Sequence, residues 1–135
     1  YIGVVYFFNE HYYFAPLSSP KTKHLKMSNK AIDIFKIDNG ILGIININNM
    51  IPTPLECVSE VLPQINDAKY KALLIKQITF LNDHKLELLG KVKQFHLRYI
   101  KNYLPIRIQE RCCDFDLLEI KCSEWETSKS NGILD

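Results

Sequence analysis

The hydrophobic period of the chain changes once, near Asp67, and this change restricts the fold more than any other feature. Before Asp67, short stretches rich in β-branched and aromatic residues are separated by turn-forming residues, which is typical of β-strands. After it, apolar residues recur three or four positions apart, as they do along one face of a helix. The sequence therefore predicts an α+β fold, in which strands come first and helices follow.

The strand-forming half predicts two β-hairpins. The first has a polar turn at residues 9–10, and Pro16 marks the end of its second strand as an edge or a bulge. The second has the turn signal Asp38-Asn39-Gly40. Together they predict a compact, strongly twisted antiparallel sheet, whose strands we expect at residues 1–8, 11–17, 31–37 and 41–47.

The helix-forming half predicts two long helices that cover one face of the sheet. Asp67 is a good N-cap for the first helix, and residues 82–83 interrupt the pattern at its end. Apolar residues at helical spacing then resume over residues 88–103. The second helix is expected to end before Pro105, because proline cannot continue a helix.

A short third helix and two irregular segments complete the expected layout. Asp116 and Glu119 have the spacing of a capping box, so they are expected to open the third helix. Residues 18–30 are polar and basic, which predicts a long loop. The tail from Thr127 is expected to be frayed.

Charge is unevenly distributed, although the net charge of the 135 residues is only +2. Residues 21–36 contain five lysines and one carboxylate, Asp33, whereas residues 110–126 are rich in carboxylates. This pattern favours a localised anionic partner over a uniformly basic surface. With 47% hydrophobic residues, the chain can bury a core as a single domain over residues 1–135.

Targeting signals and metal-ligand patterns are absent from the sequence. No apolar run reaches the length of a membrane-spanning helix and no signal peptide is visible, so we expect a cytoplasmic protein with no membrane partner. The four cysteines lack the spacing of zinc ligands and the four histidines are scattered. Neither a metal nor a cofactor is therefore expected.

The side chains best suited to chemistry lie in and just after one proline-stiffened bend. Hydroxyl and ammonium groups donate hydrogen bonds to phosphate oxygens, and a lysine beside a scissile phosphate neutralises charge that grows in the transition state. A histidine can exchange a proton near neutral pH. Spacing alone still favours an ordinary solvated loop whose serines cap turns. The groups are Ser18, Ser19, Lys21, Thr22, Lys23, His24 and Lys26.

A known family shares short blocks with this chain, in the same order over most of its length. The blocks are Tyr1-Ile2-Gly3-Val4-Val5, Tyr13-Phe14-Ala15-Pro16-Leu17-Ser18-Ser19-Pro20-Lys21, Leu42-Gly43-Ile44-Ile45-Asn46, Asn49-Met50-Ile51-Pro52, Tyr70-Lys71, Lys76-Gln77, Phe80-Leu81, Cys113-Asp114-Phe115 and Leu117-Leu118-Glu119. No block is decisive alone, but the ordered set is specific. The chain thus resembles the ToxN/AbiQ family, the toxins of type III toxin–antitoxin systems, with the CptN branch as the nearest likeness.

The resemblance implies a metal-independent endoribonuclease. Members of the family cut A-rich single-stranded RNA to give a 2′,3′-cyclic phosphate and a 5′-hydroxyl. It also implies a fold akin to the MazF/Kid toxins. The partners it implies are substrate mRNA and a repeat-derived antitoxin RNA, held as a pseudoknot in a closed protein–RNA assembly. The family usually has a further N-terminal strand with a site tyrosine and a site lysine, so we expect a segment of this kind to precede the chain.

Site residues follow from the same resemblance. Ser18 and Ser19 match the family's hydroxyl pair, and Lys21 matches its loop lysine. The resemblance assigns Lys21 to charge stabilisation, with proton donation to the leaving oxygen as a second role. It assigns Ser19 to the scissile phosphate and Ser18 to positioning. The chemistry is consistent, because the 2′-hydroxyl of RNA is itself the nucleophile and no protein nucleophile is needed.

RNA contacts are expected at further positions once the resemblance is taken into account. Tyr12 and Tyr13 alternate on a strand, so one of them faces outward and could stack on a base; a core or rim position is the alternative. For the helical residues in the set, a solvated helix face is the alternative. The predicted RNA-binding residues are Tyr13, Thr22, Lys23, His24, Lys26, Lys76 and Gln77.

Two other functions use the same features. A non-catalytic RNA-binding module on a small twisted sheet would need the same cations and aromatic rings. A protein-interaction domain would have no affinity for RNA. Incubation with a short A-rich RNA in a chelator separates the three hypotheses: the enzyme produces cyclic-phosphate ends, the module binds the RNA in a salt-sensitive manner without cutting it, and the interaction domain does not bind it.

Overall fold

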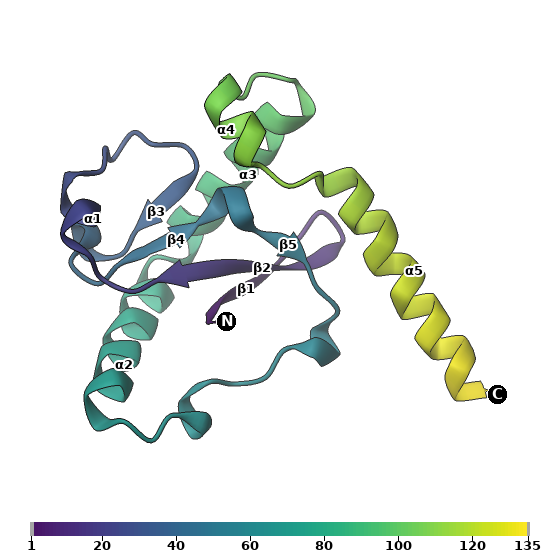
Figure 1. The fold of residues 1–135 in the computed structure, drawn as a ribbon, viewed down its shortest axis with the longest axis horizontal. Helices are drawn as coiled ribbons and strands as arrows, with labels where there is room; N and C mark the ends of the chain where they lie inside the picture. Colours follow the sequence, from purple (N-terminus) through teal and green to yellow (C-terminus); the bar gives the residue numbers. More distant parts are fainter. Residues whose placement is uncertain (1, 135) are drawn as a thin grey trace.

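The computed structural model describes residues 2–134 of the chain, with side chains described up to residue 129. One antiparallel sheet forms the centre and helices pack against it (Figure 1). The strands are β1 (Gly3–Phe8), β2 (His11–Ser18), β3 (Ile34–Lys36), β4 (Ile44–Asn46) and β5 (Ile51–Pro52). The helices are α1 (Thr22–Lys26), α2 (Ala68–Asp83), α3 (Lys85–Ile100), α4 (Ile106–Arg111) and α5 (Phe115–Leu134). The α+β class predicted from the sequence is confirmed.

β2 organises the sheet, because it pairs with three other strands. The strand order is β1-β2-β4-β3, and β5 also pairs with β2. Asn9 and Glu10 join β1 to β2 with φ angles of 54° and 64°, the combination of a type I′ hairpin turn. At the opposite end of β2, Leu17 pairs with Ile45 of β4. β2 therefore carries the chain from the predicted hairpin turn to the bend that follows Ser18.

The hydrophobic core joins the sheet to α2, α3 and the start of α5. Tyr13 on β2, Phe95 on α3 and Phe115 on α5 are all buried. Phe115 meets the Tyr13 ring edge-on at 6.0 Å and the Phe95 ring at 6.2 Å, arrangements that aromatic pairs favour. The Tyr13 hydroxyl donates a hydrogen bond of 2.9 Å to Glu119, which fastens α5 to the sheet.

Four helical features differ from the prediction. α1 forms within residues 18–30, which were expected to be a loop, and α4 was not expected. α5 is capped by Asp114, not by Asp116: the Asp114 carboxylate accepts from the amide of Leu117 at 3.1 Å. α5 also continues to Leu134, so the expectation of a frayed tail from Thr127 is wrong.

The two long helices form where the sequence predicts them, with the break between them directly after Asp83. The Asp67 carboxylate accepts from the amide of Tyr70 at 2.9 Å and caps α2 as expected. α3 ends at Ile100, before the predicted limit, where Asn102 adopts a left-handed φ of 59°. In the part of the chain that the structure describes, none of the helices combines the length and the apolar character needed to cross a bilayer.

Candidate active site

A hollow of about 620 Å³ opens between α1, the end of β2, β4 and α4. We call it the α1 hollow. It is polar and carries positive charge on more than one side, since lysines come from the α1 segment and an arginine comes from the end of α4. Its polar and charged lining includes Ser18, Lys21, Lys23, Asp33, Asn46 and Arg111.

Ser18 is held in place at the end of β2 by two neighbours. Its hydroxyl oxygen accepts a hydrogen bond of 2.7 Å from the side-chain amide of Asn46 on β4. Gly43 lies against the Ser18 carbonyl with a φ of 105°, and a Cβ at position 43 would overlap that oxygen. A glycine is needed there both for the left-handed backbone and for the close approach. The result is a hydroxyl group fixed at the mouth of the hollow.

Lys21 is positioned through a buried histidine. Nδ1 of His24 accepts a hydrogen bond of 3.1 Å from the Lys21 amide, and the His24 amide donates to the Lys21 carbonyl at 2.9 Å. These two bonds close the first turn of α1. The imidazole is 0% exposed, whereas the Lys21 side chain is exposed. The lysine therefore leaves a fixed backbone with its ammonium group free to meet a ligand.

The protonation state of His24 follows from the same contacts. Burial, together with the positive charges of Lys23 and Lys21, lowers the pKa of the His24 imidazole below its usual 6.5. The ring is neutral at neutral pH, and its Nδ1 can then act as the acceptor for the Lys21 amide. Gly40 allows the backbone to pass close to His24, because a Cβ at position 40 would come within 2.5 Å of the His24 carbonyl oxygen.

Arg111 closes the hollow on the α4 side. Its guanidinium lies 3.4 Å from the Asp33 carboxylate, and 60% of the Arg111 side chain is exposed against 12% for Asp33. The ion pair anchors the arginine while most of its donors remain available. Asp33 also holds the backbone beyond β4, because its carbonyl accepts from the amides of Ile47 and Asn48 at 2.9 and 3.2 Å.

Within residues 2–134, no three His, Cys, Asp or Glu side chains are grouped so that they could hold a metal ion.

Comparison with known proteins decides the family. The model of a family described as "Toxin ToxN, type III toxin-antitoxin system" matches residues 1–123. The chain belongs to the ToxN family. Endoribonuclease ToxN of Bacillus thuringiensis subsp. kurstaki is 32% identical over 133 residues, covering 93% of this chain and 68% of that protein. Endoribonuclease ToxN of Pectobacterium atrosepticum is 32% identical over 127 residues, covering 90% and 71%.

Two solved structures share the fold of this ToxN family member. One comes from work on a bacterial antiviral system regulated by a processed non-coding RNA; its TM-score is 0.72 at 28% identity, covering 87% of this chain and 73% of that one. The other comes from work on type III toxin–antitoxin systems in which a non-coding RNA pseudoknot inhibits the toxin; its TM-score is 0.63 at 27% identity, covering 92% and 77%.

Three of the hydroxyl and lysine residues predicted from the sequence line one hollow. Ser18, Lys21 and Lys23 line the α1 hollow. Ser19 lies between Ser18 and Lys21 in the chain and is exposed. Thr22 and Lys26 are exposed on α1. The assignment of these residues to catalysis or RNA binding stays a prediction.

Three residues predicted to contact RNA are buried instead. Tyr13 is 0% exposed and faces the core, so its ring cannot stack on a base; Tyr12 is the outward-facing tyrosine of the pair. His24 is buried beneath the lysines, where it positions Lys21. Gln77 is 1% exposed and donates a hydrogen bond of 2.8 Å to the Leu42 carbonyl. Each of the three supports the fold through its burial.

Lys76 remains a surface residue. It is exposed on α2 but does not line the α1 hollow. Its predicted RNA contact is therefore separate from the groups gathered around Lys21.

Several polar residues of the hollow were not among the predicted site residues, including Asn46, Asn48 and Arg111. Asn46 ends β4 and Asn48 lies two residues beyond it, and the cluster of asparagines at this strand end was the available signal. Arg111 had no local signal, because its partner Asp33 lies 78 positions away in the sequence and the two meet only in the folded chain.

Proposed function

We propose that the protein is the endoribonuclease toxin of a type III toxin–antitoxin system. The observation that carries the proposal is the grouping of Ser18, Lys21, Lys23 and Arg111 around one hollow in a chain of the ToxN family. Hydroxyl groups and fixed cations are what a phosphodiester needs to be bound and activated. The two curated relatives named above are endoribonucleases, which supports the same activity here.

The reaction is a transphosphorylation within the RNA. The 2′-hydroxyl oxygen forms a bond to the adjacent phosphorus, the bond from phosphorus to the 5′-oxygen breaks, and the products are a 2′,3′-cyclic phosphate and a 5′-hydroxyl. One proton leaves the 2′-hydroxyl and one reaches the 5′-oxygen. The protein has to align the three atoms and stabilise the negative charge on the pentavalent phosphate.

Lys21 supplies the charge stabilisation. Its exposed ammonium group extends from a backbone that His24 fixes, and in the second role described above it donates the proton to the leaving oxygen. Ser19 contacts the scissile phosphate, and Ser18, held by Asn46, positions the ribose–phosphate linkage. Arg111 adds a further cation on the opposite side of the hollow. The nucleophile comes from the substrate, so the step is proposed to proceed without a metal.

RNA is proposed as inhibitor as well as substrate. An antitoxin RNA, processed from a repeat and folded as a pseudoknot, would occupy the surface that A-rich mRNA uses, in a closed protein–RNA assembly. The inhibition of a related toxin by a non-coding RNA pseudoknot supports this partner. We place the protein in the bacterial cytoplasm, where release of the toxin from its RNA would arrest growth and limit phage infection.

The test is the identity of the products. An A-rich single-stranded RNA is incubated with the protein in a chelator, and the ends are analysed by mass spectrometry. We expect 2′,3′-cyclic phosphate and 5′-hydroxyl ends. The same RNA with every 2′-hydroxyl methylated is the matched control and should remain intact, since its nucleophile is blocked. Intact unmodified RNA that nevertheless binds in a salt-sensitive manner would favour a non-catalytic RNA-binding module.

A further inference from the structure

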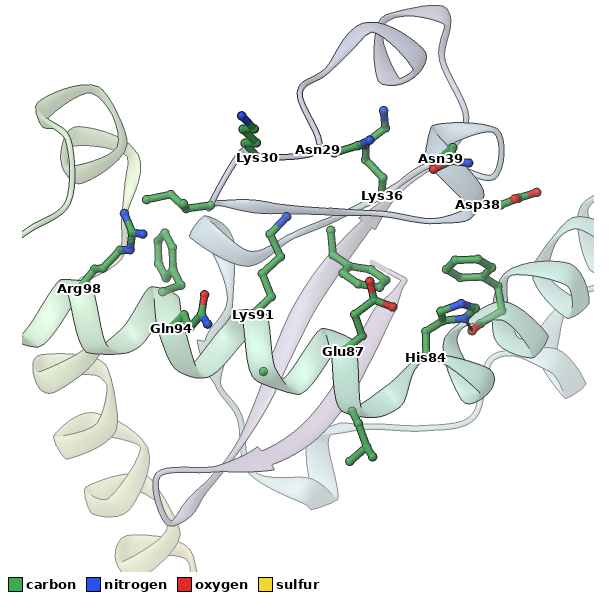
Figure 2. Close-up of a pocket in the computed structure, with 16 residues that line it drawn as sticks. Asn29, Lys30, Lys36, Asp38, Asn39, His84, Glu87, Lys91, Gln94 and Arg98 are labelled. Carbon is green, nitrogen blue, oxygen red and sulfur yellow. Dashed lines mark hydrogen bonds between the residues drawn. The ribbon is translucent and has the colours of Figure 1, made fainter.

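A second hollow, of about 820 Å³, lies between α3 and the segment that leads into β3. We call it the α3 hollow. Figure 2 shows Lys91 and Arg98 on α3, with Lys30 and Lys36 on the segment across from them. Four cations line this hollow against two carboxylates, which are Asp38 and Glu87. The α3 hollow is thus larger than the α1 hollow and, like it, carries net positive charge.

Two of these cations are available to a ligand. Among residues 2–129, no carboxylate lies within ion-pair distance of Lys91 or Arg98. Lys36 is less free, because its ammonium group donates to the Met27 carbonyl at 3.0 Å. Burial lowers the pKa of Lys91, while the carboxylates of Asp33 and Glu87 oppose that shift. An anionic ligand beside Lys91 would relieve the cost of holding a partly buried ammonium group.

Stacked rings form one end of the hollow. The rings of Phe80 and His84 are parallel to within 13°, with centroids 3.9 Å apart. His84 is fixed by a hydrogen bond of 2.8 Å between its Nδ1 and the Phe80 carbonyl. Figure 2 shows His84 at one end of the lining and Arg98 toward the other. A fixed ring beside cations is the combination that binds single-stranded nucleic acid, since the ring stacks on a base and the cations follow the phosphates.

Gly90 lines the α3 hollow without a side chain that could fill it. It lies inside α3, where glycine is less favourable than alanine by about 0.5–1 kcal/mol. Packing does not require it, because a Cβ at this position would have no atom within 4 Å. A larger side chain here would enter the hollow without displacing a native contact, which makes Gly90 a clean place to obstruct it.

The two hollows lie on either side of one segment. Ser28 and Asp33 line the α1 hollow, whereas Asn29 and Lys30, which lie between them in the chain, line the α3 hollow. The segment continues into β3, the edge strand of the sheet, whose outer side carries no further strand in the described structure. An extended chain can therefore pass round this edge from one hollow to the other.

We propose that the α3 hollow binds a stretch of single-stranded RNA that flanks the nucleotide held in the α1 hollow, with the strand passing round β3. Phosphates lie near Lys91 and Arg98, and a base stacks at the Phe80–His84 end. This inference rests on the proposed function, because it takes the α1 hollow to hold the scissile phosphate. Either substrate RNA or antitoxin RNA could supply the stretch, since both present the same backbone and bases.

Obstruction of the hollow is the first test. Gly90→Leu is compared with Ala72→Leu, which adds an apolar side chain to an exposed position on α2 away from both hollows. Affinity is measured by fluorescence anisotropy with 2′-O-methyl A-rich RNA of about twelve nucleotides, which cannot be cut, and with a trinucleotide. We expect Gly90→Leu to weaken binding of the longer RNA by about tenfold, as for the loss of one stacked base. The trinucleotide should bind both variants equally.

Charge removal is the second test. Arg98→Ala is compared with Lys93→Ala, an exposed cation on α3 outside the hollow. The dependence of affinity on salt should become shallower by about one ion for Arg98→Ala and remain unchanged for Lys93→Ala. Equal salt dependence in the two variants, with wild-type affinity for the longer RNA in Gly90→Leu, would overturn the inference.

The source of the RNA and the proposed function are tested separately. The titration is repeated with RNA that copurifies with the protein: weakened binding of only that RNA assigns the hollow to the antitoxin, and weakened binding of only the A-rich RNA assigns it to substrate. Either result supports an RNA site. If the wild-type protein fails to cut unmodified RNA, the proposed function fails, while the binding comparison at Gly90 still decides whether the α3 hollow holds RNA.

Discussion

At the scale of single residues, the site depends on a buried histidine that holds the backbone of Lys21. His24 looked in the sequence like a proton donor or a phosphate contact, because it follows two lysines and two serines. The structure buries its ring and uses Nδ1 to hold the Lys21 amide. A histidine three residues after Lys21 thus does what glutamine does in a capping box. The exposed lysine gains a fixed starting point from this contact.

We predict that His24→Ala lowers the free energy of unfolding by about 1–2 kcal/mol, because it removes a capping acceptor and leaves a cavity. RNA cleavage should fall as well, since Lys21 loses its support. His24→Gln should retain most of both properties, because the glutamine carbonyl can accept from the same amide. Chemical denaturation and cleavage rates measure the two effects. Equal losses in the two variants would contradict the capping role.

Stability should depend on pH through the same ring. The pKa of His24 is lower in the folded chain than its usual 6.5, so the unfolded chain binds a proton first as pH falls. Stability from the neutral ring is therefore complete above pH 6.5 and is lost as pH decreases through the lowered pKa. Denaturation of the wild type and of His24→Gln across this range should show the wild type losing more stability in acid. If the stability of the two proteins falls in parallel as the pH decreases, the role of His24 in the pH dependence is refuted.

At the scale of elements, glycines and caps decide where the bend and α5 lie. The Asp38-Asn39-Gly40 turn and the Asp67 cap were correctly predicted, because their signals are local in sequence. The cap of α5 was assigned to Asp116 by its spacing to Glu119, but Asp114 fills the role. Glu119 is occupied elsewhere: it accepts from Asn9 and Tyr13, more than a hundred positions away. Contacts between residues so far apart in the sequence produce no local pattern from which they could be predicted.

We predict that Gly43→Ala destabilises the fold and reduces cleavage. A methyl group there would overlap the Ser18 carbonyl and strain a backbone with a φ of 105°, at a cost of about 1–3 kcal/mol. Gly90→Ala is the control, because nothing lies within 4 Å of its Cβ and helix propensity favours alanine. Thermal denaturation should show a decrease for the first variant and a small increase for the second. A neutral Gly43→Ala would contradict the close approach.

Helix capping gives a second element-scale prediction. Asp114→Ala should lower the free energy of unfolding by about 1 kcal/mol, because the amide of Leu117 loses its acceptor. Asp116→Ala should have a smaller effect, since Asp116 is exposed in the first turn of α5 and retains only a favourable interaction with the helix dipole. Circular dichroism during denaturation compares the two. A larger loss from Asp116→Ala would restore the capping box predicted from the sequence.

At the scale of the whole molecule, β3 and the segment before it separate two cationic hollows, while residues 110–126 carry six carboxylates against two cations. The small net charge of +2 hides this division, as the sequence indicated. Family blocks in the sequence predicted the ToxN membership and the lysine of the bend, because both depend on contiguous residues. Arg111 and the α3 hollow could not be predicted, because each forms only when α3 and α4 fold against β3 and its neighbouring loops.

Lys21 is proposed to stabilise the charge on the phosphate being cut. The most direct measurement is the rate of cleavage of a short A-rich RNA in a chelator, by the wild type, by Lys21→Ala and by the surface control Lys93→Ala. We predict that Lys21→Ala is slower by about a hundredfold or more, while Lys93→Ala and the folding of both variants are unchanged. Cleavage by Lys21→Ala at the wild-type rate would contradict the account.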